Sequence, residues 1–294
     1  MTRWIFTFLF FLLTLLSSYL ALESFVESKI KEKLDAKIST LPIKVSYSDL
    51  NYYLLSNEIV IKNLKTSEFG IDLFVRRITI DLPLFARKKE LPESLKVNVE
   101  GLIIPPGFPV VSGLLKTLGL SENLLEVDFQ AGYLFEDDIF FSYLTTHLEN
   151  LANFQLSVSL KNLTRERLEK FLKGKTLNRY LIGKIELAYL SLKYKDLGLL
   201  RTFLEYEARQ EGKTPEELKE RFITAIEKNA ENNPVFRERI AYPLISFIKN
   251  PKCLEIMVKP KKPLSLKSLK RFLQDHPDII KIIEVTALRF NICS

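Results

Sequence analysis

Histidine and glycine are scarce in this chain of 294 residues, which has two histidines and ten glycines. His147 and His276 lie far apart, and neither has a cysteine or carboxylate at the spacing of a metal site. The sequence also lacks a glycine-rich phosphate loop and a nucleophile elbow. We therefore expect no catalytic residues, no metal site and no cofactor, and we predict that the protein is not an enzyme.

Long stretches of one charge sign are also missing. The chain has 43 basic and 36 acidic residues, a net charge of +7, and the two signs are interleaved. The densest basic clusters, 87–89 and 259–262, are short and lack aromatic neighbours, so we expect no nucleic-acid partner. The acidic triplet 136–138 lies between two predicted strands, which favours a hairpin turn over a calcium site.

One long hydrophobic run is present, at residues 4–22, with no charge and no proline. As a helix it would span roughly 28 Å, the thickness of a bilayer's hydrocarbon core. We therefore predict a cytoplasmic stub and a transmembrane anchor over residues 1–22. A cleaved signal peptide is the alternative, and it is disfavoured because the best cut, after Ala21, puts the bulky Tyr19 three residues before the bond.

Residues 23–40 continue with apolar positions at helical spacing and charged residues between them, which predicts an amphipathic juxtamembrane helix. This helix either packs on the domain that follows, or lies on the lipid surface or against a partner helix. Lysines at 29, 31, 33 and 37 outnumber the single Arg3 before the run, so the positive-inside rule argues for a cytoplasmic body.

From residue 43 the hydrophobic period changes to two, which predicts an antiparallel β-rich region over 41–162. The apolar parity slips at Arg76-Arg77, which indicates a bulge or tight turn. The expected strands, including one beyond this region, are 43–48, 51–55, 58–65, 71–82, 96–104, 127–135, 139–146, 154–160 and 184–194.

Residues 163–294 predict an α/β region with a helical block at 196–250 packed on the same sheet. Thr214 and Glu217 form a capping box, and Pro243 should kink the third helix of the block. Strands are expected at 253–259 and 285–293. The predicted fold class is α+β: an N-terminal transmembrane helix, a curved antiparallel β-sheet body and a C-terminal helical block.

The two cysteines fall on the non-core parity of these last two strands. If the strands pair antiparallel, Cys253 at the start of one lies beside Cys293 at the end of the other, and a disulfide can form. The alternative is two unrelated thiols.

Four segments, 194–201, 212–218, 247–251 and 260–264, resemble the C-terminal part of YdgA-like and AsmA-like bacterial proteins. The strands at 48–64 and 125–160 are similar in style to the β-rich repeats of these families. The resemblance implies an inner-membrane anchor, a periplasmic β-rich body with an apolar concave face, and a role in envelope lipid homeostasis. On this basis we expect a single-pass protein of the bacterial inner membrane with its bulk in the periplasm.

The expected function is a non-enzymatic, membrane-anchored envelope module that binds phospholipid or another apolar ligand, or assists a lipid-handling complex. The alternative is a scaffold that docks envelope proteins through its helical block. The residues expected to line the apolar face are Phe129, Tyr133, Phe154, Leu156 and Val158.

Overall fold

The structure is a computed structural model. It describes residues 2–68, 71–83, 91–106, 108, 112–118, 120, 124–172, 183–262, 264–269, 283 and 286–293, of which the side chains of 2–13, 68, 112, 114, 117, 171 and 172 are not described.

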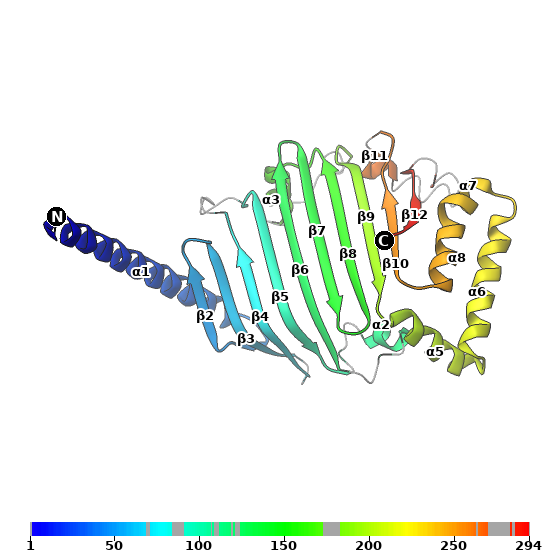
Figure 1. The fold of residues 1–294 in the computed structure, drawn as a ribbon, viewed down its shortest axis with the longest axis horizontal. Coiled ribbons are helices and arrows are strands. Elements are labelled where there is room, and N and C mark those ends of the chain that lie inside the picture. The colour runs from blue at the N-terminus through cyan, green and yellow to red at the C-terminus, as the bar shows by residue number, and fades with distance from the viewer. Residues whose placement is uncertain are drawn as a thin grey trace.

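One twelve-stranded antiparallel sheet forms the body of the protein (Figure 1). Its strand order is β1-β3-β4-β5-β6-β7-β8-β9-β10-β12, with β2 paired to β3 and β11 paired to β9. Consecutive strands are antiparallel neighbours from β3 to β10, even where a helical segment joins them, as between β9 and β10. The pairing of β8 with β9 makes one continuous sheet of the predicted regions 41–162 and 163–294.

The strands are β1 (Lys44–Ser46), β2 (Asp49–Tyr53), β3 (Glu58–Glu68), β4 (Ile71–Asp81), β5 (Ser94–Ile104), β6 (Leu125–Glu136), β7 (Ile139–Leu148), β8 (Ala152–Lys161), β9 (Glu186–Asp196), β10 (Cys253–Val258), β11 (Leu264–Ser265) and β12 (Arg289–Ile292). The helices are α1 (Thr2–Ile38), α2 (Ser112–Thr117), α3 (Arg165–Leu172), α5 (Leu199–Glu211), α6 (Pro215–Ala230), α7 (Pro234–Phe236), the π-helix η1 (Arg237–Ala241) and α8 (Tyr242–Lys249).

The predicted membrane anchor is wrong. Within the described part of the chain, no helix is long and apolar enough to cross a membrane. From Glu23 onwards α1 carries charged residues at short intervals, including Glu27 and Lys29, so this part of the helix is too polar for a bilayer's apolar core. The side chains of residues 4–13, which belong to the predicted anchor, are not among those that the structure describes.

Two further predictions depended on that anchor and are corrected with it. The fold is a large antiparallel sheet with helices, and the described residues contain no helix that could serve as the predicted transmembrane element. The assignment as a single-pass inner-membrane protein with its bulk in the periplasm is contradicted by the same finding.

The C-terminal part of helix α1 contacts the edge strand β2, and the rest of the helix projects away from the sheet (Figure 1). The carboxylate of Glu27 accepts a hydrogen bond from the backbone N–H of Tyr52 at 3.1 Å, and that of Glu23 accepts one from Leu54 at 3.3 Å. These are outward-facing donors of an edge strand, which would otherwise be open to pairing with another chain. Glu23 and Glu27, which follow the apolar run, therefore accept hydrogen bonds from the backbone at the sheet edge.

The parity slip predicted at Arg76-Arg77 occurs inside a continuous strand. Both arginines are exposed on β4, and the strand continues without a turn. The neighbouring strands are distorted at the same level, where Asn63 has φ 49° and Gly101 has φ 64°. Strands β3, β4 and β5 therefore change parity at the same level. This keeps the apolar side chains of all three strands on the same side of the sheet.

The helical block packs at the other end of the sheet, with α8 against β10 and β12 (Figure 1). Helix α6 begins with the predicted capping box. The backbone N–H of Glu217 donates to the hydroxyl of Thr214 at 3.2 Å, and the backbone N–H of Thr214 donates to the carboxylate of Glu217 at 2.7 Å. Pro243 lacks an N–H and is preceded by the π-helix η1, whose wider turn separates α7 from α8.

Candidate ligand-binding face

Two adjacent rows of apolar side chains cross ten strands on one face of the sheet. Directly opposed residues of antiparallel strands point to the same side, so the register defines each row. The Leu156 row is Tyr52, Ile59, Ile80, Val97, Ala131, Leu144, Leu156, Leu192, Ile256 and Phe290. The Phe154 row is Leu50, Ile61, Ile78, Val99, Phe129, Thr146, Phe154, Tyr194, Leu254 and Ile292.

These rows, which we call the apolar face, are long and carry no charge. At about 4.8 Å between strands, ten strands extend roughly 43 Å. The polar atoms of their side chains are the hydroxyls of Thr146, Tyr52 and Tyr194. A face this uniform needs a cover of other apolar groups.

The middle of the apolar face is only partly covered. Among the described helices, α1 contacts β2 at one end and α8 contacts β10 and β12 at the other, and Leu115 of α2 belongs to a buried cluster against which Phe154 and Tyr194 pack. Leu50 and Leu254, near the two ends, are buried, whereas Leu144 in the middle exposes 39% of its surface. Leu156 and Phe129 are half-buried. The central strands therefore present apolar side chains to solvent.

The total surface supports this description. The protein exposes 19450 Å², whereas a compact monomer of 34.1 kDa exposes about 12,800 Å². A single-layer sheet with a partly covered apolar face and a projecting helix is an open shape, in agreement with a large total surface.

Aromatic rings lie on both sides of the Leu156 row. Tyr133, Phe135 and Phe140 form one cluster, with ring centroids 5.0–5.9 Å apart. On the other side, the ring of Tyr194 stacks on Phe154 at 5.0 Å and meets Phe247 of α8 edge-on at 5.5 Å. Smaller aliphatic side chains thus lie between two rigid aromatic borders.

All five predicted face residues lie on this side of the sheet. Leu156 belongs to its own row, and Phe129 and Phe154 belong to the Phe154 row. Tyr133 and Val158 both oppose Ser142 of β7, in the next row.

Sequence reasoning missed the contributions of β7 and β9, including Leu144, Leu192 and Tyr194. On β7 the apolar-face positions 142 and 146 are Ser and Thr, which obscures the alternation around Leu144. On β9 the alternation of 190, 192 and 194 was visible in the sequence. Only the pairing of β9 with β8 showed which face it joins.

Burial raises the pKa of two tyrosines on this side of the sheet. The pKa of Tyr133 is raised by burial, and its hydroxyl donates to the carbonyl of Pro92 at 3.3 Å. The pKa of Tyr194 is raised by burial and then by its hydrogen bond to the carboxylate of Asp196. Both groups stay neutral at physiological pH, which keeps the face uncharged.

The opposite face carries a polar row along the same strands. One row there consists of Thr79, Asn98, Gln130, Thr145, Gln155, Lys193, Glu255 and Asn291. A hollow of about 460 Å³ lies on this side over β7 to β10, and His147, Asn153 and Lys195 line it. His147 is hydrogen-bonded to Asn153 there, which gives it a structural partner.

The remaining sequence candidates have structural roles or lie outside the described residues. The triplet 136–138 forms the turn between β6 and β7, with Asp137 at φ 51°. His276 lies outside the described residues. In the described part of the chain, no group of three or more His, Cys, Asp or Glu side chains is placed to hold a metal ion.

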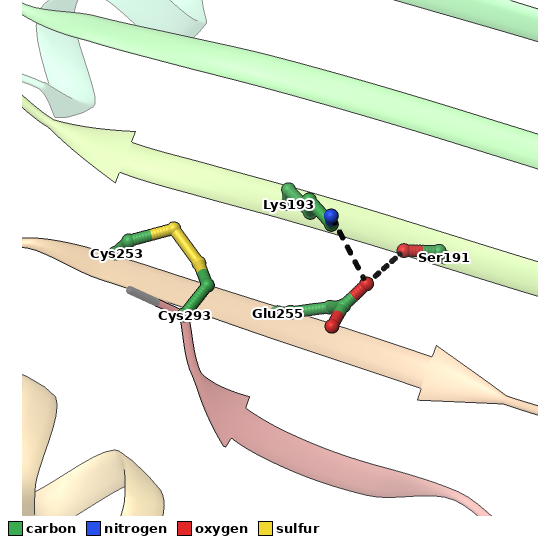
Figure 2. The surroundings of a disulfide bond; sticks show 5 residues. All are labelled: Ser191, Lys193, Cys253, Glu255 and Cys293. Atoms are coloured by element: carbon green, nitrogen blue, oxygen red, sulfur yellow. Dashed lines mark hydrogen bonds and ion pairs between the residues drawn. A yellow bond between two sulfur atoms is a disulfide. The ribbon is translucent and has the colours of Figure 1, made fainter.

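A disulfide joins Cys253 and Cys293 on the polar side of the sheet (Figure 2). Their Cα atoms are 5.2 Å apart, and β10 pairs antiparallel with β12, so the start of one strand lies beside the end of the other. Figure 2 also shows Glu255 beside them, which accepts a hydrogen bond from Ser191 at 2.8 Å and lies 3.8 Å from the amine of Lys193. The bond fixes the last strand to the sheet.

Comparison with known proteins gives one family match. A family described as "Uncharacterized protein" matches residues 145–289, from β7 to the start of β12. No curated protein matches the chain. The matched segment includes strands β8 to β10, on the right of the central sheet in Figure 1, together with the helical block and Cys253. The resemblance to the YdgA-like and AsmA-like families stays a prediction.

Proposed function

We propose that this protein is a non-enzymatic binding module that holds the hydrocarbon part of a lipid-like molecule on the apolar face. The observation that carries the proposal is the partial exposure of an unbroken apolar row across the central strands. Covering such a surface with hydrocarbon is favourable by about 25 cal/mol for each Å² removed from water.

The chemistry of the face favours a hydrocarbon chain over a protein partner. Protein interfaces carry about one hydrogen bond per 100–200 Å². The central part of the two rows offers only the hydroxyl of Thr146 for such bonds. A flexible chain needs no polar contacts, and the Leu156 row gives it a continuous aliphatic path between aromatic borders.

The helical block supports a docking function less well. Its apolar side chains are used within the block, in one cluster around Ile223, Ala241 and Ile245 and another around Leu204 and Leu218. The hollow between α5, α6 and α8 measures about 210 Å³, less than half the volume of the hollow on the polar face. We therefore place the binding function on the sheet.

A fluorescent fatty acid, dansylundecanoic acid, tests the proposal. The wild-type protein should bind it with a rise in fluorescence, and Leu144→Glu should weaken binding at least tenfold, because a carboxylate then lies under the chain. Leu144 is already 39% exposed, so the variant should melt within a few degrees of the wild type. Thr145→Glu is the matched control, since the next residue on β7 points to the polar face.

Two results would contradict the proposal. One is a wild-type protein that does not bind the probe, and the other is a folded Leu144→Glu variant that binds it normally. Leu156→Glu gives an independent check on β8. If this variant unfolds, at a cost of several kcal/mol, then Leu156 belongs to a closed core and the binding path does not include that strand.

A further inference from the structure

We propose that Arg239, Lys259 and Arg289 form a binding site for a phosphate group. The three side chains line a hollow of about 250 Å³ together with Ala287. They come from three places in the chain: Arg239 lies in η1, Lys259 directly follows β10, and Arg289 begins β12. This proposal does not depend on the apolar face.

Among the residues that the structure describes, no carboxylate balances the three cations. None of them forms an ion pair with an acidic residue of the described chain, whereas Arg76, Arg201 and Arg221 are each paired with a glutamate. A guanidinium N–H of Arg239 points to the carbonyl of Ile283 at 3.5 Å, and one of Arg289 points to the sulfur of Met257 at 3.2 Å. These contacts are weak and leave most of their N–H groups free for a ligand.

The charges and shapes favour phosphate over a single carboxylate. A phosphate monoester carries about −1.5 to −2 at neutral pH and three acceptor oxygens. Two planar guanidinium groups can each bind two of these oxygens, and a lysine adds a compact charge. The hollow is large enough for the phosphate group and the adjoining part of the molecule that bears it.

The backbone of the hollow is strained at Ala287, which has φ 50°. The other non-glycine residues with positive φ in the described chain are Asn or Asp, which tolerate this conformation. An alanine held there costs free energy without a side-chain hydrogen bond in return, and such residues concentrate at ligand sites.

Calorimetric titration of the full chain with inorganic phosphate tests the site. Wild-type protein should bind phosphate, and Arg239→Gln and Arg289→Gln should each weaken binding about tenfold or more, through loss of charged hydrogen bonds. Lys252→Gln, an exposed lysine before the other end of β10, is the matched control and should bind normally. All three arginine and lysine side chains of the site are exposed, so the variants should keep the wild-type melting temperature.

A second titration, with dihexanoyl phosphatidic acid below its micelle concentration, distinguishes the source of the phosphate. Binding no tighter than inorganic phosphate indicates a soluble phosphate compound. Tighter binding than inorganic phosphate that is weakened in Arg239→Gln and Arg289→Gln indicates a lipid headgroup. The site is overturned if millimolar phosphate does not bind, or if the two arginine variants bind it as well as Lys252→Gln does. Neither result affects the dansylundecanoic acid test.

Discussion

The hydroxyl of Tyr194 donates a hydrogen bond to the carboxylate of Asp196, two residues further along the chain at the end of β9. The same carboxylate accepts the backbone N–H of Gly198 at 3.2 Å and that of Leu200 at 2.9 Å. Tyr194 belongs to the apolar face, and Leu200 lies in the first turn of α5. Asp196 therefore connects the sheet to the helical block.

Replacing Asp196 should weaken this connection measurably. Asp196→Ala leaves three donors without their acceptor, and we expect a loss of about 2 kcal/mol or more in the free energy of unfolding by urea. Tyr194→Phe keeps the ring contacts and both backbone hydrogen bonds, so it should cost about 1 kcal/mol. Equal stability of Asp196→Ala and wild type would show that the carboxylate is not a structural link.

The disulfide should contribute substantially to stability. Cys253 and Cys293 are 40 residues apart, and in the chain-entropy model closing a loop of that size stabilises by roughly 3–4 kcal/mol. The double variant Cys253→Ser, Cys293→Ser should lose that amount in urea unfolding. Reduced wild type should match the double variant. Thiol counting on denatured, unreduced protein should find no free cysteine, and two free thiols would contradict the bond.

Asp81 should make the protein more stable in mild acid than at neutral pH. Its Oδ1 atom is buried with no hydrogen-bond partner in the described chain. Its pKa is raised by burial and then by the opposing carboxyl of Glu58, although the amine of Lys96 lies 3.7 Å away.

A raised pKa means that the folded chain holds this proton to a higher pH than the unfolded chain, so its stabilising effect is lost as pH rises through the folded value. Asp81→Asn should therefore raise the melting temperature at pH 7 and reduce the gain on acidification. Asp72→Asn, at an exposed position of the same strand, should do neither. A wild-type-like pH profile for Asp81→Asn would refute the assignment.

The carboxylate of Glu27 should slow hydrogen exchange at the sheet edge. In Glu27→Ala the amide of Tyr52 loses its acceptor, and we expect its exchange to accelerate about tenfold. The variant should also aggregate more readily, because an unprotected edge strand pairs with other chains. Glu32→Ala removes a carboxylate of α1 that bonds Lys29 and should leave the amide of Tyr52 unchanged. Unchanged exchange in Glu27→Ala would mean that α1 does not protect β2.

The sequence determined most of the local structure. Alternating residues such as 154–160 predicted β8, and the Thr214–Glu217 pair marked the start of α6. The parity of Cys253 and Cys293 was enough to suggest their bond, because side chains alternate strictly along a strand. These features depend on neighbours within a few residues, or on one simple assumption about pairing.

Other predictions needed information that a local pattern does not contain. An uncharged run predicted a membrane anchor, and the structure contradicts it. Helix α2 was missed, and its residues pack with Leu120 on the ends of β6 and β8. A six-residue helix has no periodicity strong enough to recognise.

Tertiary structure alone decided the functional surfaces. The Leu156 row depends on nine separate registers, and a shift of one residue in any of them would move a strand's apolar side chains to the other face. Arg239, Lys259 and Arg289 are up to 50 residues apart, and they meet only because η1 packs beside β12. The sequence thus specified which strands are apolar on one side, whereas their long-range pairing determined that these sides join into one face and that three distant cations share one hollow.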